Sequence, residues 1–341
     1  MKKIDNTKKT NLIKKLFVKL CRIIGFEIID QSNLNLPVSD RSATDNLGSI
    51  GKNIISIPLG ETQISRPVRS LDVIIKTCTA VNLVTQNKKR IFEEEKSEYT
   101  FRTIKSLIQS LKFDKEILER IKVKIYVVDH NSKKEDLKKI ENIIKTSDIN
   151  FEIINLDLKK FNQIKVLNKN NPVIENNMKA TMASILTSFN IAKKSDDLIY
   201  FVEDDYIHKK ESLSEMIITY EKIASEIGNE LFICPVDYPY LYKKMDNSKI
   251  LIGNRYHWRT VNESLLTFLT SKILINKYWS ELVLMAEDEF SPFETPLHKI
   301  YEKELCLSPV PSLAMHCTNI NSVFGISPNI NWKKLWDENK V

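Results

Sequence analysis

Between residues 70 and 237 the sequence repeats one pattern, a short run of β-branched and aliphatic residues followed by a longer segment with helical spacing. The runs are LDVIIKTC from residue 71, KVKIYVVD from 122, FEIINLD from 151, LIYFV from 198 and LFICPVD from 231. The segments 96–113, 134–146, 175–193 and 211–227 between them have the apolar spacing of helices. Strands that alternate with helices predict an α/β fold, in which helices flank a mostly parallel, Rossmann-like sheet.

Acidic residues stand where two of these predicted strands end. Asp129 ends the second run, and Glu203, Asp204 and Asp205 follow the fourth with no basic residue among them. Ligands of open α/β sheets bind at the carboxyl ends of the strands. Carboxylates gathered there without a partner nearby in the sequence indicate a bound cation, for which Mg²⁺ or Mn²⁺ is the best match. The alternative is a cluster that caps the next helix, but capping needs one acid and leaves two unexplained.

The two strand ends carry a resemblance to a known family. IYVVDHNS, followed about seventy residues later by IYFVEDDY, resembles the family 2-like glycosyltransferases with the A-type, nucleotide-diphospho-sugar-binding fold. In that family a strand ending in Asp-Asp-Gly-Ser precedes one ending in Asp-x-Asp. The resemblance covers residues 71 to about 320 and implies that Asp129 contacts the nucleotide base, Glu203 the ribose and Asp205 the metal, with Asp204 in the intervening position. DHNS departs from the family in lacking the second acid and the glycine, and Glu203 replaces the first aspartate.

The C-terminal part, residues 241–341, is expected to be the acceptor-binding half of the same domain as residues 67–240. In the family an acid at the start of a helix is the general base, and a histidine after the next strand completes the metal site. Glu294 precedes the helix-like TPLHKIYEK, and His316 lies 22 residues further on. The resemblance therefore implies Glu294 as base, with Asp288 as second candidate, and His316 as metal ligand. The alternatives are a charge favoured by the helix dipole for Glu294 and a satisfied core histidine for His316.

Aromatic and polar residues are concentrated in DYPYLYKK and NRYHWRTVNES. Flat rings and polar tips suit an acceptor sugar. Arg255 and Arg259 are candidates to face the diphosphate, since a guanidinium pairs with two phosphate oxygens at once. The alternative is an exposed hairpin whose Trp258 is packed inside.

Residues 1–66 are expected to form a basic amphipathic helix and a connecting arm. The first 24 residues hold eight Lys or Arg and one Asp, which gives them a net charge of +7. The whole chain also has a net charge of +7, so the residues after position 24 are close to neutral. A nucleic-acid partner is therefore not expected. Leu12, Leu16, Leu20 and Ile24 line one side of the helix, and lysines line the other. Two interpretations stay open: a helix lying on an anionic membrane surface, or one packed on the protein's own body.

Location follows from what the sequence lacks. No apolar run approaches the roughly 20 residues that span a bilayer, and the five cysteines form no C-x-x-C or His/Cys cluster. We expect a cytoplasmic protein that is either free or peripheral on the inner membrane.

The resemblance implies a metal-dependent, inverting glycosyltransferase of the hexosyltransferase kind, acting in polysaccharide assembly for the cell envelope. Its donor would be a UDP- or GDP-sugar, its acceptor a glycan or a lipid-linked sugar, and its cofactor Mn²⁺ or Mg²⁺. Two other functions are kept: a sugar-nucleotide nucleotidyltransferase and a non-catalytic membrane-surface scaffold. The nucleotidyltransferase would need a glycine-rich loop, and the chain has 7 glycines and no G-x-G-x-x-G.

Overall fold

A computed structural model describes residues 12–26, 49–50, 53–54, 63–80, 90–167, 171–243, 247–318, 326–327 and 329–341. The chain divides into two compact units, Met1–Thr62 and Gln63–Val341, which are described separately.

The larger unit is built on a sheet in which nine strands are described, and one half of it is wholly parallel. The strands of this half are β5 (Asn150–Asn155), β4 (Lys122–Asp129), β3 (Ser70–Thr77) and β6 (Leu198–Glu203), in that spatial order. Each pairs in parallel with its neighbour, which confirms the α/β arrangement expected from the alternating pattern. Leu71, Val73, Ile74 and Ile75 of β3 are fully buried, as a parallel strand covered on both faces requires.

The other half of the sheet is mixed, which accounts for the loss of alternation in the C-terminal sequence. β11 (Phe268–Ser271) is antiparallel both to β6 and to β8 (Phe232–Ile233). β12 (Cys306–Val310) is parallel to β8, and β10 (His257–Thr260) and β9 (Ile250–Ile252) complete the edge as an antiparallel hairpin. The parallel half therefore continues directly into strands from the C-terminal part of the chain.

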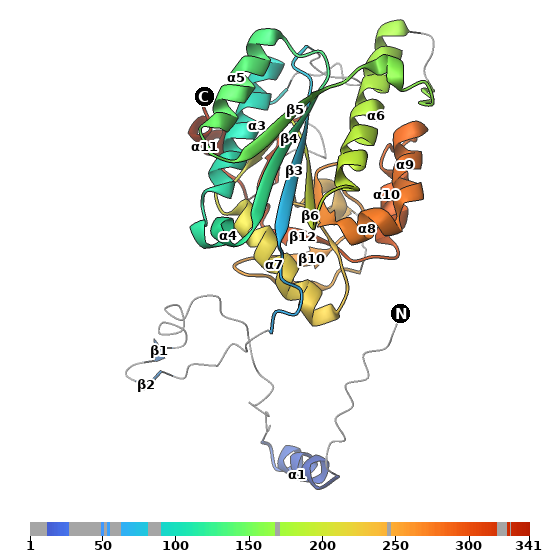
Figure 1. Ribbon diagram of the computed structural model, residues 1–341. Coiled ribbons are helices and arrows are strands. Elements are labelled where there is room, and N and C mark those ends of the chain that lie inside the picture. Colours follow the sequence, from blue (N-terminus) through green and yellow to red (C-terminus); the bar gives the residue numbers. More distant parts are fainter. Residues whose placement is uncertain are drawn as a thin grey trace. The chain divides into compact units, whose positions relative to one another are not determined.

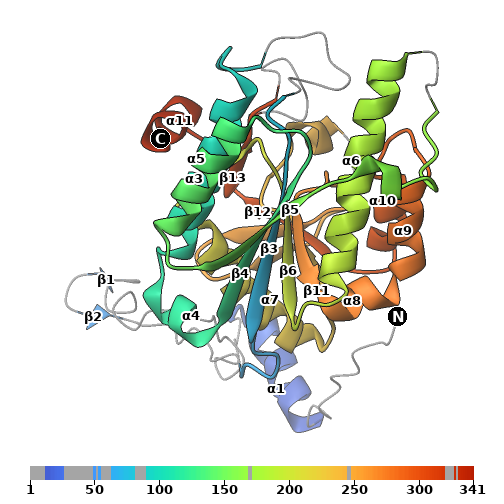
Figure 2. The ribbon, with the colours of Figure 1, turned by 45° about the horizontal axis from the view of Figure 1, so that its top comes forward.

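Helices cover both faces of the sheet. Figures 1 and 2 show α3 (Lys96–Leu111) and α5 (Lys134–Lys145) on one side of β3 and α6 (Pro172–Ala192) on the other. The helix α7 (Ser212–Ile227) follows β6. Local signals set several ends: Asn171 caps α6 ahead of Pro172, and Gly228, at φ +65°, ends α7. The shorter helices are α4 (Lys115–Arg120), α8 (Lys272–Lys277), α9 (Trp279–Glu287), α10 (Thr295–Tyr301), η2 (Leu158–Lys160) and η3 (Pro239–Lys243).

A small second sheet joins the end of the chain to the parallel half. β7 (Tyr206–His208) pairs antiparallel with β13 (Ala314–His316). The last helix, α11 (Trp332–Glu338), adds Trp336, whose ring stacks on Phe92 at 3.9 Å between centroids. Tyr99 of α3 packs in the same cluster. The C-terminal residues thus hold the segment that leads into α3.

In the N-terminal unit the expected amphipathic helix is present as α1 (Leu12–Ile23), and Gly25, at φ +89°, follows it. Leu16, Phe17, Leu20 and Ile23 on its apolar side are 57–73% exposed. Two short strands, β1 (Ser49–Ile50) and β2 (Asn53–Ile54), pair antiparallel. Most of the expected connecting arm, residues 31–66, lies outside the described residues. Among the helices described, none has the length and apolar character to cross a membrane.

Candidate functional site

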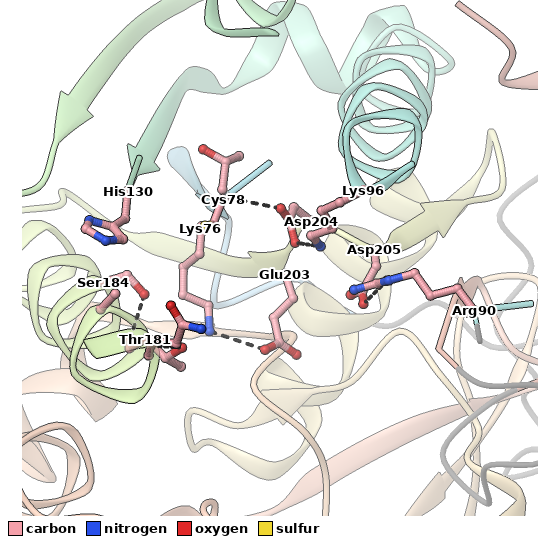
Figure 3. Close-up of a pocket in the computed structure, with 13 residues that line it drawn as sticks. Lys76, Cys78, Arg90, Lys96, His130, Thr181, Ser184, Glu203, Asp204 and Asp205 are labelled. Atoms are coloured by element: carbon pink, nitrogen blue, oxygen red, sulfur yellow. Dashed lines mark hydrogen bonds and ion pairs between the residues drawn. The ribbon is translucent and has the colours of Figure 1, made fainter. Parts of the chain in front are cut away.

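A pocket of about 250 Å³ lies at the carboxyl ends of β3, β4 and β6 (Figure 3). From β3 the chain winds outward through β4 to β5, and it then returns to place β6 on the other side of β3. This reversal is a topological switch point, where ligands of open α/β sheets bind. The lining residues are Lys76, Thr77, Cys78, Arg90, Lys96, His130, Asn177, Ala180, Thr181, Ser184, Glu203, Asp204 and Asp205.

Each of the three consecutive acids in this pocket has its own cation. Lys76 Nζ lies 3.3 Å from Glu203 Oε1, Lys96 pairs with Asp204, and Arg90 Nη1 lies 3.0 Å from Asp205 Oδ2 (Figure 3). The cations come from β3, from the segment before α3 and from the first residue of α3, far from the acids in sequence. Among the described lining residues three positive and three negative side chains therefore cancel. His130 adds no charge at pH 7, because burial lowers the pKa of its imidazole.

Asp204 joins three elements. Its carboxylate accepts hydrogen bonds from Lys96, from Thr100 Oγ1 at 3.0 Å and from the backbone N–H of Cys78 at 3.2 Å. The residue is only 8% exposed. Its oxygens are already used to hold the ends of β3 and β6 to the start of α3, so it is a structural tie within the pocket.

Asp205 and His316 lie next to each other, as the resemblance implied. The β7–β13 pairing sets His316 opposite Tyr206, and the two rings stack at 4.4 Å. His316 Nε2 is 3.6 Å from Asp205 Oδ1. Burial by itself would raise the pKa of Asp205, but His316, Lys96 and Arg90 outweigh it and hold the pKa below its usual range. Asp205 is therefore an ionised carboxylate, and the imidazole nitrogen of His316 lies beside it.

These two side chains are of the types that ligate metal ions in proteins. Within the described residues no group of three or more His, Cys, Asp or Glu is placed to hold a metal. Mg²⁺, however, is usually bound by one or two carboxylates together with substrate phosphates and waters. Asp205 and His316 fit an ion of that kind, one whose remaining ligands come with the substrate.

Tyr99 and the backbone of Cys317 hold Arg90 in place, and two further aromatic residues pack beside Tyr99. Its guanidinium lies over the Tyr99 ring at 4.9 Å, and its Nη1 also donates to the carbonyl oxygen of Cys317 at 3.3 Å. Phe92, two residues later, stacks on Trp336 and donates its backbone N–H to the Tyr99 hydroxyl at 3.3 Å. Arg90, like Lys76 and Lys96, was missed in the sequence, because no local pattern links these cations to the acids they meet.

Asp129 is not among the residues that line the pocket. Its carboxylate, on a residue that is 2% exposed, accepts from Thr77 Oγ1 at 2.7 Å and from the backbone N–H of Ser132 at 3.2 Å. The next residue, His130, lines the pocket, and its Nδ1 has no hydrogen-bond partner among the described residues. The first strand-end motif therefore presents His130, and Asp129 braces the turn that follows β4.

Glu294 occupies the N-cap position of α10, but its side chain makes no capping bond. Pro296 is in the first turn and β12 follows, as the sequence predicted. Burial, and then the charge of Glu203, raise the pKa of Glu294 to about 7, against the opposing effect of Lys76. Glu294 is thus a carboxyl group that exchanges a proton near neutral pH, close to two residues of the pocket.

The second candidate base has a different environment. Asp288 follows α9, and its carboxylate lies 3.1 Å from Lys165 Nζ with 35% of its side chain exposed. Such an ion pair is typical of a protein surface.

Neither arginine proposed for the diphosphate lines this pocket. Arg255 is exposed, and its backbone N–H donates to Glu215 at 2.9 Å. Arg259 pairs with Asp237 at 2.8 Å and borders a separate pocket beside Tyr242. Trp258 between them is fully buried, which matches the alternative interpretation of a hairpin with a packed tryptophan.

The wall opposite the ion pairs is polar but uncharged. Asn177, Ala180, Thr181 and Ser184 of α6 line this side of the pocket. The hydroxyls of Thr181 and Ser184 already donate to backbone oxygens within the helix, so they remain available as acceptors. The pocket therefore has one charged wall and one hydroxyl-bearing wall.

No protein-family model matches the sequence, and no curated protein is similar to it at a significant level. Several solved structures that resemble the chain are glycosyltransferases. Residues 1–349 of S. aureus TarS share 16% identity over 61% of this chain and 48% of that chain, with a TM-score of 0.34. The galactosyltransferase LgtC, in complex with donor and acceptor sugar analogues, shares 13% identity over 62% of this chain and 63% of that chain, with a TM-score of 0.35. The bifunctional glycosyltransferase WbbM shares 10% identity over 82% of this chain and 51% of that chain, with a TM-score of 0.39.

The match thus spans about half of TarS residues 1–349 and of WbbM, and 29% of the longer TarS chain. These solved structures belong to the class that the sequence resembles.

Proposed function

We propose that the chain is a metal-dependent, inverting glycosyltransferase that uses a nucleotide-diphospho-sugar donor. The observation that carries this proposal is Glu294, a largely buried carboxyl group with a pKa of about 7 close to Glu203 of the strand-end pocket. A general base works best when its pKa is close to the operating pH. A purely structural acid would gain nothing from burial beside a second carboxylate.

The donor would occupy the pocket at the switch point. A nucleotide sugar carries a negative diphosphate between two uncharged ring systems, and the pocket has a charged wall and a hydroxyl-bearing wall to receive them. Asp205 and His316 are the residues that would hold the Mn²⁺ or Mg²⁺ ion. When bound, such an ion offsets the charge that develops on the departing nucleoside diphosphate.

The reaction would be a single displacement at the anomeric carbon of the donor. The acceptor oxygen forms a bond to this carbon as the bond from carbon to the diphosphate oxygen breaks, and the nucleoside diphosphate leaves with that electron pair. Glu294 accepts the proton of the acceptor hydroxyl. One displacement without a covalent intermediate inverts the anomeric configuration.

For the acceptor we propose a glycan or a lipid-linked sugar, reached from a membrane surface. The observation in favour is α1, where Leu16, Phe17, Leu20 and Ile23 are exposed on a helix with Arg22 in its last turn and no acidic residue in its first. An amphipathic helix of this composition suits an anionic bilayer surface.

Calorimetric titration with UDP and GDP, in Mn²⁺ and in EDTA, tests the donor and the metal together. We expect nucleotide binding to strengthen with Mn²⁺, because the ion and the diphosphate complete each other's ligands. Affinity that is equal in EDTA would contradict the metal assignment, and no binding in either buffer would contradict the glycosyltransferase. A nucleotidyltransferase would instead release pyrophosphate from a nucleoside triphosphate and a sugar phosphate.

A further inference from the structure

We propose that Arg90 is a built-in counter-ion that takes the place of the metal at Asp205 while the donor site is empty and turns to the diphosphate when metal and nucleotide arrive. This role of Arg90 rests on the proposed function, and no sequence pattern had assigned a role to the residue. It makes Arg90, rather than Arg255 or Arg259, the guanidinium of the donor site.

The contacts of Arg90 support this role. Arg90 Nη1 forms an ion pair with Asp205 Oδ2 at 3.0 Å, and the charge of Asp204 also acts on its guanidinium, while the ring of Tyr99 and the carbonyl oxygen of Cys317 are neutral contacts. Arg90 is 8% exposed and still lines the pocket, so its guanidinium borders the space that a ligand would fill. The planar fork of an arginine matches the oxygens of a phosphate as well as those of a carboxylate.

Charge balance in the pocket gives the reason for an exchange. The charges of the described lining residues cancel. A divalent ion alone would add uncompensated positive charge to this partly buried site, and a diphosphate alone would add uncompensated negative charge. The two together restore neutrality. Asp205 can then give its oxygen to the ion, and Arg90 keeps a negative partner in the diphosphate.

The other two ion pairs are less suited to such an exchange. Lys96 pairs with Asp204, whose second oxygen is fixed by Thr100 and by the backbone of Cys78. Among the described residues, the histidine placed beside one of the three acids is His316, and it lies next to Asp205 rather than next to Glu203. Asp205 alone has both a cation to release and a histidine 3.6 Å away.

Asp205→Asn provides the decisive test, because the proposal predicts opposite changes in nucleotide affinity, relative to the wild type, in EDTA and in Mn²⁺. In EDTA the variant has lost one negative charge and leaves Arg90 without its carboxylate, so UDP or GDP should bind roughly tenfold more tightly than to the wild type. In Mn²⁺ the variant should bind nucleotide no better than in EDTA, since the metal donor is gone. Weaker binding than the wild type in EDTA would overturn the inference.

Arg90→Met tests the same pair from the other side. Mn²⁺ without nucleotide, followed by the paramagnetic resonance signal of the free ion, should bind more tightly to this variant than to the wild type. Arg90→Lys keeps the charge and should stay close to the wild type. Arg120→Met is the matched control, because Arg120 pairs with Glu221 away from the pocket. Equal Mn²⁺ affinity in the wild type and Arg90→Met would overturn the inference.

Failure of the proposed function has a different appearance. In that case no nucleotide binds to any variant in either buffer, whereas failure of the inference leaves metal-strengthened nucleotide binding in the wild type. Should Arg90→Met not fold, as judged by its near-ultraviolet dichroism, the Asp205→Asn titrations decide alone.

Discussion

At the residue scale, Glu294 combines two properties with opposite effects on the protein. Its burial beside Glu203 raises the pKa of the carboxyl group to about 7, which suits proton transfer at neutral pH. The same burial makes the ionised form costly to the fold. Residues of this kind mark functional sites, where stability is given up for reactivity.

Glu294→Gln should lower turnover by roughly 10²–10⁴-fold and leave donor affinity nearly unchanged, because the proton is removed only as the acceptor attacks. Glutamine keeps the shape of the side chain and cannot accept the proton. Steady-state transfer rates and nucleotide titrations together separate the two effects. Asp288→Asn, at a surface ion pair, is the control and should change turnover little. Loss of turnover in the control alone would identify Asp288 as the base.

Glu294→Gln should also stabilise the fold at high pH. The folded-state pKa of about 7 lies above the usual 4.5, so folding takes up a proton between these values and stability falls as pH rises through them. At pH 8 the variant should gain up to about 3 kcal/mol. At pH 5, where Glu294 is protonated when folded, the gain should largely vanish. Thermal unfolding at both pH values measures this, and a gain of the same size at both would argue against the buried, ionised carboxylate.

At the scale of single elements, α1 differs from the long helices α3, α6 and α7 of the Gln63–Val341 unit. The helices α3, α6 and α7 bury most of their apolar residues in the core, whereas Leu16, Phe17, Leu20 and Ile23 of α1 are largely exposed. The period of its sequence predicted the helix and its two faces. Helical periodicity does not show what the apolar face contacts. The membrane-surface helix and the helix packed on the protein's own body therefore both stay predictions.

Deleting residues 1–25 should abolish co-sedimentation with phosphatidylglycerol vesicles and leave the fold of the remainder intact. Each basic residue near anionic headgroups contributes about 1 kcal/mol, so the helix should bind these vesicles in preference to phosphatidylcholine ones. Lys19→Glu with Arg22→Glu is the matched variant: it keeps the apolar side and should lose the preference. Unfolding of the truncated chain would support the packed-helix interpretation instead.

At the scale of the whole Gln63–Val341 unit, the two halves of the sheet depend on each other. β11, from the C-terminal part of the sequence, lies between β6 and β8 and pairs with both. β13 likewise pairs with β7 and brings His316 to Asp205. The expected halves 67–240 and 241–341 therefore share one sheet, and the candidate site takes residues from both.

A fragment of residues 63–240 should fail to fold, while residues 63–341 should give a cooperative thermal transition. Without β11 the edge of β6 is left unpaired and its buried aromatic residues are exposed. Circular dichroism melts and amide dispersion in NMR spectra compare the two. A folded fragment with a sharp transition would show that the parallel half is a domain in its own right.

The sequence by itself determined the parallel half of the sheet, because burial on both faces and helical periodicity are local patterns that repeat along the chain. It also located Glu203, Asp204 and Asp205 at a strand end, and Glu294 at a helix start. Only the tertiary structure decided which side chains form ion pairs with the three acids at the strand end. Lys76, Arg90 and Lys96 reach them from more than 100 residues away in sequence, and the carboxylate of Asp129 holds the turn that follows β4. Pairing of charges across a fold depends on distances in space, which no spacing along the chain records.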